Sequence, residues 1–312
     1  MESSLLQPEV KAAVRKMWWR AALSFIKKNW LWFVVGGSAL IVLLILLIVL
    51  LLLFKRRNAT LIALQSCLTG VKISKDTTSL VVPSNQCNDI SLHTMDLSVF
   101  KKLRSVEVES RSFENIVNLK VEGLPLLEKI VVKDNCFSKQ LGSLSVKGCD
   151  ALSSISIGVG SFVSFSQLAI ESSPVLSQLV LYGSNFNNAD RISLVGLNGL
   201  KTVEVGADSF LLKEGSFALT DCSSLTSLKI GAHSFAKFNS LTIENDDSLS
   251  SVEIGSLQDS ASFTTAPLLL QGECAFVVEW IDLPSLSTVV IGKESFRDTD
   301  TVVVESVSSS PE

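Results

Sequence analysis

The sequence predicts a mainly β protein, a solenoid with two short strands per turn, preceded by an N-terminal amphipathic helix and one transmembrane helix. Three observations support this prediction. Eight of the 16 Phe residues share one repeating register, alternating apolar and polar stretches lie on both sides of them, and the block 30–54 carries no charge. The whole chain of 312 residues is only 19% charged, against about 25% in a typical soluble globular protein.

Residues 30–54 are predicted to form a transmembrane helix. At about 1.5 Å per residue, a helix of this length reaches roughly 37 Å, enough to cross a hydrocarbon core of about 30 Å. Trp30 and Trp32 at one end, and the cluster Lys55-Arg56-Arg57 at the other, are typical of membrane boundaries. A cleaved signal peptide would have a shorter apolar region and small residues at its cleavage site. We therefore expect a retained signal-anchor in contact with a lipid bilayer.

Residues 1–29 form a basic N-terminal tail, in which residues 8–27 show the spacing of an amphipathic helix that lies on an anionic membrane surface. A solvated, flexible tail is the alternative. Five Lys or Arg residues lie within fifteen residues before the span and three lie within fifteen residues after it. This bias favours a type II, single-pass protein whose C-terminal part is extracellular or lumenal. The margin is small, so a cytosolic C-terminal part remains the second hypothesis.

The repeats begin after a linker and N-terminal cap at residues 55–96, and the predicted solenoid covers residues 97–305, with a tail at 306–312. A turn of about 24 residues cannot bury its apolar face alone, but stacked turns share one core. The shared Phe positions are expected to stack inside as a structural ladder, at intervals of 24 or 25 in the numbering and finally of 28 and 33. They are Phe113, Phe137, Phe162, Phe186, Phe210, Phe235, Phe263 and Phe296.

Two small residues recur beside this ladder. Gly follows the first strand of several turns, where a positive φ is expected: Gly158, Gly206, Gly231, Gly255 and Gly292. Ser precedes the Phe in six of the eight turns. Its hydroxyl is expected to satisfy backbone groups of the turn.

The six cysteines permit fifteen disulfide pairings. Cys67 and Cys87 flank the cap and are the candidate disulfide if the cap faces an oxidising space. Cys136 with Cys149, and Cys222 with Cys274, stay open as pairs, and buried free thiols are the alternative for Cys149 and Cys222.

The repeating unit, L-x-x-L-x-I-G-x-x-S-F followed by L-x-I, resembles the BspA-like class of leucine-rich repeats found on surface proteins of bacteria and protists. The resemblance covers Leu97 to Val304. It implies a curved solenoid with a ladder of strands on each side, serving adhesion or protein binding. The asparagine ladder of typical leucine-rich repeats is absent, and the frequent Cys of the class is matched only at Cys149 and Cys222.

No catalytic, cofactor or metal site is predicted. The sequence contains none of the common zinc, nucleotide or hydrolase motifs. The sequence pI near 5.4, without a basic stripe beyond the N-terminal region, argues against nucleic acid as a partner. His233 and the acidic turn at residues 244–247 are expected to be solvated, and Trp280 is expected in the core or a cap.

Strand parity predicts the candidate binding face. The outward residues of the first strands are the more varied and charged, and they are expected to form the recognition face: Glu107, Val131, Ser156, Val180, Glu204, Lys229, Glu253 and Val290. The outward residues of the second strands form a flat, nearly neutral face suited to stacking on another copy in a homo-oligomer: Lys120, Ser145, Ala169, Ser193, Ala218, Thr242, Leu269 and Val303.

These features together favour a single-pass, membrane-anchored leucine-rich-repeat protein of the cell surface. We expect it to act without catalysis, as an adhesion or receptor-like module for a protein or glycan. The alternative is a cytosol-facing, membrane-tethered scaffold for protein–protein interaction.

Overall fold

The computed structural model describes residues 17, 19, 20, 24, 43–49, 60–68, 73–255, 277–281, 283–291 and 301–305. The chain divides into two compact units, Met1–Arg56 and Arg57–Glu312. Each unit is considered by itself.

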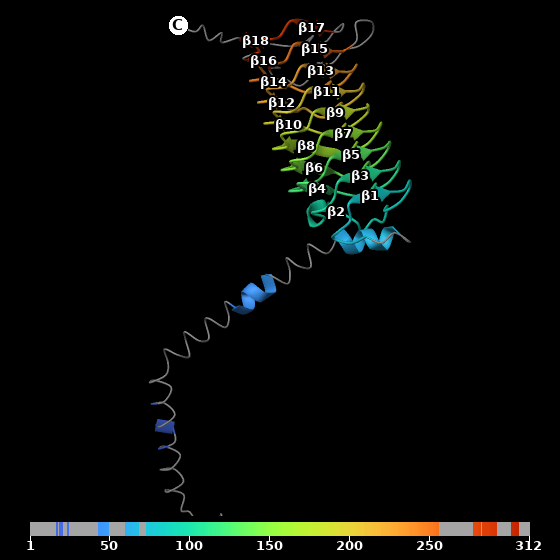
Figure 1. Cartoon of the computed structure of the whole chain (residues 1–312), viewed down its shortest axis with the longest axis vertical. Helices are drawn as coiled ribbons and strands as arrows, with labels where there is room; N and C mark the ends of the chain where they lie inside the picture. The colour runs from blue at the N-terminus through green and yellow to red at the C-terminus, as the bar shows by residue number, and fades with distance from the viewer. Residues whose placement is uncertain are drawn as a thin grey trace, which may run out of the picture. The chain divides into compact units, whose positions relative to one another are not determined.

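The second unit is a parallel β-solenoid built from two nine-stranded sheets, whose strands alternate along the chain (Figure 1). Sheet A consists in spatial order of β1 (Ser79–Val82), β3 (Ser105–Val108), β5 (Lys129–Val132), β7 (Ser154–Ile157), β9 (Gln178–Leu181), β11 (Thr202–Val205), β13 (Ser227–Ile230), β15 (Ser251–Ile254) and β17 (Thr288–Ile291). Sheet B consists of β2 (Thr94–Asp96), β4 (Asn118–Glu122), β6 (Gly142–Lys147), β8 (Phe165–Glu171), β10 (Arg191–Val195), β12 (Ser216–Thr220), β14 (Ser240–Glu244), β16 (Val277–Ile281) and β18 (Thr301–Glu305).

The alternation of side chains along each strand explains why the two sheets enclose a core. In β11, Val203 and Val205 are buried and Glu204 between them is exposed. Residues of a strand point alternately to opposite faces, so one apolar row per sheet enters the interior. The same pattern in most described strands produces a core of Leu, Ile, Val and Phe running along the stack. The expected mainly β solenoid with two strands per turn is confirmed.

The lengths of the last turns differ from the prediction. As far as β15, the numbering advances by 24 to 26 from the start of one sheet A strand to the start of the next. From Ser251 in β15 to Thr288 in β17 it advances by 37, and from Val277 in β16 to Thr301 in β18 by 24. The predicted intervals of 28 and 33 are therefore wrong, because a single turn carries the whole insertion.

This insertion explains why Phe263 does not fit the repeat. Each ladder Phe of the described turns lies five residues after the last residue of a sheet A strand, as Phe235 does after Ile230. Phe263 lies nine residues after Ile254, whereas Phe296 keeps the five-residue spacing from Ile291. Both Phe263 and Phe296 lie outside the described residues.

The solenoid starts earlier than predicted. β1 and β2 lie within residues 55–96, the predicted linker and cap, and they pair in register with β3 and β4. The boundary at residue 97 is therefore wrong, since the first turn has no Phe at the repeating position. The cap itself is a helix over residues 60–67, which we call the cap helix, and Leu64 is fully buried in it.

In the first unit, residues 17, 19, 20, 24 and 43–49 are helical. The side chains from Leu43 to Val49 are 45–69% exposed. Within the part of the chain that the structure describes, no helix is both long and apolar enough to cross a membrane. Residues 30–42 and 50–54 of the predicted span, most of the predicted amphipathic helix and the tail at 306–312 lie outside the described residues.

Candidate recognition face and its scaffold

Six of the predicted ladder phenylalanines stack in one column inside the solenoid. The centroids of adjacent rings are 4.5–5.6 Å apart, and after the first pair the ring planes differ by only 2–8°. Phe165 and Phe238 add edge-to-face contacts at 4.9 and 5.0 Å to Phe162 and Phe235, a feature that the repeat alignment missed. We call this column the Phe ladder; its described members are Phe113, Phe137, Phe162, Phe186, Phe210 and Phe235.

Two positions of each of these turns have left-handed backbone at this corner, the ladder Phe and the residue two before it. All six described ladder residues have φ between 53° and 59°, a conformation that is strained for a bulky side chain. Among the predicted glycines only Gly255 has a positive φ within the described residues. Gly206 and Gly231 are needed for a different reason, because a Cβ atom at either would collide with the backbone of the preceding turn.

A column of buried polar residues runs beside the Phe ladder and connects each turn to the one before it. The Ser161 hydroxyl accepts a hydrogen bond from the Cys136 N–H at 3.1 Å and donates to the Lys133 carbonyl at 2.7 Å. Ser112 and Ser234 make the same pair of bonds with their preceding turns. The predicted role of the serine hydroxyls is thus confirmed for Ser112, Ser161 and Ser234, whereas Ser262 and Ser295 lie outside the described residues. We call this set the polar column: Ser112, Cys136, Ser161, Asn185, Ser209 and Ser234.

The described free cysteines belong to the packing of the turns. The Cys136 thiol lies 3.2 Å from the Glu109 carbonyl, which matches the bond that Ser161 makes one turn later. Burial raises the pKa of Cys136 to about 11 and that of Cys222 to about 12, and it also raises the pKa of Cys149. These three thiols are buried and unpaired, so they are protonated and poorly reactive at neutral pH.

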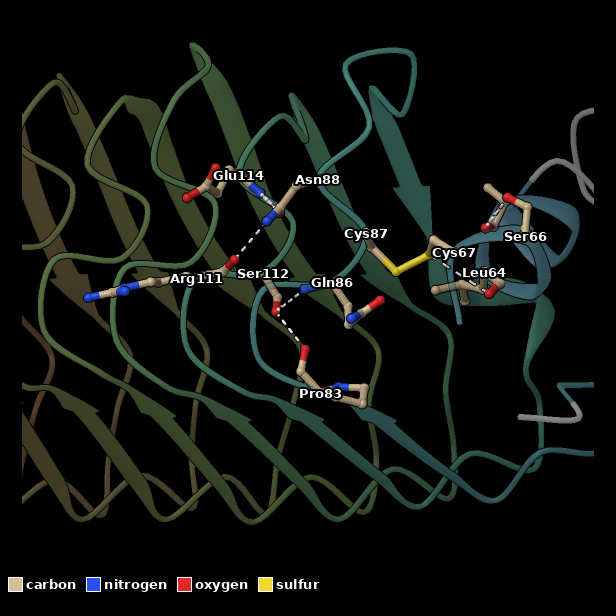
Figure 2. The surroundings of a disulfide bond; sticks show 11 residues. Leu64, Ser66, Cys67, Pro83, Gln86, Cys87, Asn88, Arg111, Ser112 and Glu114 are labelled. Carbon is tan, nitrogen blue, oxygen red and sulfur yellow. Dashed lines mark hydrogen bonds between the residues drawn. A yellow bond between two sulfur atoms is a disulfide. The ribbon is translucent and has the colours of Figure 1, made fainter. Parts of the chain in front are cut away.

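Cys67 and Cys87 form a disulfide with a Cα–Cα distance of 5.0 Å. The bond joins the cap helix to the turn after β1, as Figure 2 shows. Beside it, Ser112 accepts from the Gln86 N–H and donates to the Pro83 carbonyl, so the polar column begins at the same turn (Figure 2). The disulfide therefore fixes the cap to the first turn of the solenoid.

The predicted recognition face forms one continuous row across sheet A. Strand pairing places its eight residues side by side from Glu107 to Val290. The row also includes Val81 in β1, which is 47% exposed and which sequence analysis missed because the first turn was assigned to the cap. We call these nine residues the recognition row: Val81, Glu107, Val131, Ser156, Val180, Glu204, Lys229, Glu253 and Val290.

One member of the recognition row was predicted wrongly as an exposed contact residue. Val180 is only 9% exposed, and its neighbours in the row are Ser156 and Glu204. Glu204, Lys229 and Glu253 are exposed, and Glu107, Val131, Ser156 and Val290 are half-buried. The Lys229 ammonium lies 3.8 Å from a Glu253 carboxylate oxygen, an exposed ion pair that adds little stability. Acidic, basic and aliphatic side chains therefore share one row on the outer face of sheet A.

The outward row of sheet B carries fewer charged residues than that of sheet A. Strand pairing carries it from Lys120 through Thr242 as predicted. The next position is Glu279 in β16, and Val303 follows in β18. Leu269, which was predicted there, lies outside the described residues. The assignment failed because the insertion in this turn precedes β16.

The structure also tests what the sequence predicted for the burial of Trp280 and of the acidic turn. Trp280 is 6% exposed, as expected for a core residue. Asp246 in the acidic turn at 244–247 was predicted to be solvated, but it is fully buried, and one carboxylate oxygen accepts from the Cys222 N–H at 2.7 Å. Its position in the repeat is that of buried Cys222 and Leu197, one and two turns earlier. Burial raises the pKa of Asp246 to about 7.

His233 lies at the surface as expected, with its ring 3.2 Å from the exposed Asp208 carboxylate. No group of three or more potential metal ligands comes together within the described ranges.

Comparison with models of protein families, with curated proteins and with solved structures found no match to this chain. Its function therefore has to be inferred from its own residues.

Proposed function

We propose that this chain is a membrane-anchored, non-catalytic binding module whose solenoid presents the recognition row to a protein or glycan outside the cytosol. The observation that carries the proposal is the row itself. It holds carboxylates, an ammonium group and aliphatic side chains in fixed register on nine adjacent strands. A rigid, repeating surface of this kind suits recognition of an extended partner.

The anchor in this proposal is the uncharged segment 30–54. The described part of it, residues 43–49, is helical with exposed apolar side chains. A helix is the form in which such a segment hides its backbone polar groups in lipid.

The disulfide between Cys67 and Cys87 supports an extracellular or lumenal solenoid. Disulfides persist in oxidising compartments and are rare in the cytosol. This agrees with the bias of basic residues before the span, which favours a cytoplasmic N-terminus. The cytosol-facing scaffold lacks such support.

The proposal also includes kinship with the BspA-like leucine-rich repeats. It is supported by the repeating unit, which places a ladder Phe five residues after each of the six sheet A strands from β3 to β13 and a second strand after it. In that class, similar solenoids serve adhesion or protein binding.

Protease protection tests the orientation. In sealed vesicles with their cytosolic side outward, the solenoid is expected to resist protease until detergent is added, whereas a cytosolic marker is digested at once. Digestion of the solenoid without detergent would show the cytosolic scaffold instead.

Paired variants test the recognition row. The double variant Glu204→Gln/Glu253→Gln removes two exposed charges from the row, and Lys120→Gln with Thr242→Ala alters the opposite sheet. Cells that display the protein are scored for binding to panels of glycans and of cells. Loss of binding with the first variant alone is expected, and equal loss with both would contradict the assignment of the face.

A further inference from the structure

A basic pocket lies at the N-terminal end of the solenoid. It has a volume of about 250 Å³ and is lined by Lys75, Ser98, Val99 and Lys101. Ser98 and Val99 belong to the short 3-10 helix η1 (Leu97–Val99), and the two lysines come from equivalent positions before β1 and β3. Both lysines are exposed. The lining holds two ammonium groups and a hydroxyl, and it includes no carboxylate.

The two ammonium groups of the lining outnumber the one carboxylate bonded to the pocket wall, that of Asp96, which accepts from the Ser98 N–H at 3.0 Å. The Lys101 ammonium donates to the Gly123 carbonyl at 2.7 Å, which fixes its position. The nearest acidic group along the chain, Asp76, is paired with Lys102 at 2.8 Å. A pocket of this size with two ammonium groups and a hydroxyl suits a phosphate group, whose oxygens accept hydrogen bonds from such donors.

The wall of the same pocket is hydrogen-bonded to the cap helix. The Thr60 hydroxyl, at the start of the cap helix, accepts from the Asp96 N–H at 3.1 Å, and the Asp96 carboxylate accepts from the Ser98 N–H at 3.0 Å. Two hydrogen bonds thus connect the cap helix to the pocket wall. Thr60 is six residues after Phe54, the last residue of the predicted span, and an extended chain of that length covers at most about 20 Å.

We propose that this pocket binds the phosphate of a phospholipid headgroup and so holds the first turn of the solenoid against the bilayer. The inference rests on the proposed membrane anchor, since the anchor brings the pocket to the headgroups. Every phospholipid carries a phosphate, so the same contact is available in either leaflet, and anionic headgroups add attraction.

Binding by the full chain in a phosphate-free, non-ionic detergent tests the pocket. The probes are dihexanoyl phosphatidylserine, inorganic phosphate, dihexanoyl glycerol and a sulfated disaccharide, each followed by titration calorimetry. The double variant Lys75→Gln/Lys101→Gln is expected to bind the phospholipid roughly 30-fold more weakly than the unchanged chain, at about 1 kcal/mol per lysine. Lys129→Gln/Lys201→Gln loses the same charge at exposed lysines outside the pocket lining, and it is expected to bind normally.

The single variant Lys75→Gln keeps the hydrogen bond from Lys101 to Gly123. It is expected to bind the phospholipid roughly fivefold more weakly than the unchanged chain. The proposal is overturned if the unchanged chain binds no phospholipid, if both double variants bind alike, or if dihexanoyl glycerol binds as well as the phospholipid. Tighter binding of inorganic phosphate or of the sulfated disaccharide would also overturn it, in favour of a free anion or a glycan. Alkaline extraction of cell membranes tests the anchor separately, so failure of the anchor and failure of the pocket give different results.

Discussion

Cys87 and Phe113 occupy equivalent positions of successive turns. Each lies five residues after the end of a sheet A strand, and their φ angles are 57° and 56°. The first position of the Phe ladder is therefore filled by a cysteine, and its sulfur is bonded to the cap helix at Cys67. The disulfide therefore joins the cap helix to the residue at the first ladder position.

Loss of this disulfide is expected to loosen the cap. Cys67→Ser should lower the free energy of unfolding by about 2–4 kcal/mol, because the bond closes a 20-residue separation that is otherwise free in the unfolded chain. Urea unfolding with and without reductant measures this. Cys149→Ser, which keeps the disulfide, is the control, and its unfolding should respond to reductant as the parent's does. An unchanged midpoint of the parent protein in reductant would contradict the expectation.

Phe162→Ala is expected to be among the most damaging core changes. Phe162 is fully buried and contacts the rings of Phe137, Phe165 and Phe186. Truncation of such a ring costs about 3–5 kcal/mol, through lost burial and the cavity left behind. Equilibrium unfolding gives the loss. Leu212→Ala, at a side chain that is 52% exposed, should change stability by less than about 0.5 kcal/mol; similar losses for both would rule out a stacked ladder.

Asp246 is expected to make the solenoid less stable as the pH rises. Its pKa in the folded protein, about 7, lies above the usual value of 3.8. The folded state therefore holds this proton more tightly than the unfolded state. The associated stability is fully present below about pH 4 and is lost as the pH rises to about 7.

Asp246→Asn should remove this dependence and raise the melting temperature at pH 8. The variant amide oxygen can still accept from the Cys222 N–H, as the Asn185 amide oxygen accepts from the Ser161 N–H. Melting temperatures at pH 5 and pH 8 test this. Asp247→Asn, at an exposed neighbour, is the matched control, and a parent protein that is more stable at pH 8 than at pH 5 in this comparison would contradict the role of Asp246.

Gly206→Ala is expected to destabilise the protein by about 1–3 kcal/mol, because the added methyl group would collide with the Tyr182 carbonyl of the preceding turn. Gly196→Ala is the comparison. Gly196 has a φ of 65° but no atom within 4 Å of an added Cβ, so only backbone strain of about 1–2 kcal/mol is expected. Thermal unfolding distinguishes the two costs, and a larger loss for Gly196→Ala would show that conformation outweighs crowding.

Much of the scaffold could be predicted because the repeats are nearly equal in length. Alternation within Thr202–Val205 is enough to turn Glu204 outward, and constant spacing then places Lys229 beside Glu204 and Glu253 beside Lys229. The recognition row follows from these two regularities alone.

The errors occur where a residue type departs from the repeat. Cys87 was not recognised as a ladder position because it is not a Phe, and Phe263 was accepted because it is one. Asp246 was assigned to solvent by its charge, although Leu197 and Cys222 at the same repeat position are buried. Aligning repeat positions by strand boundaries, without regard to residue type, would have found all three. Val180 was placed on the outer face correctly, but spacing alone does not predict that it is only 9% exposed there.

The polar column gives the stack a direction. The hydroxyls of Ser112, Ser161 and Ser234 each bond backward, accepting from and donating to the preceding turn. A nascent chain leaving the ribosome delivers the cap first, and each later turn then finds its partners already in place. The solenoid is thus suited to vectorial assembly during synthesis, with the cap as its seed.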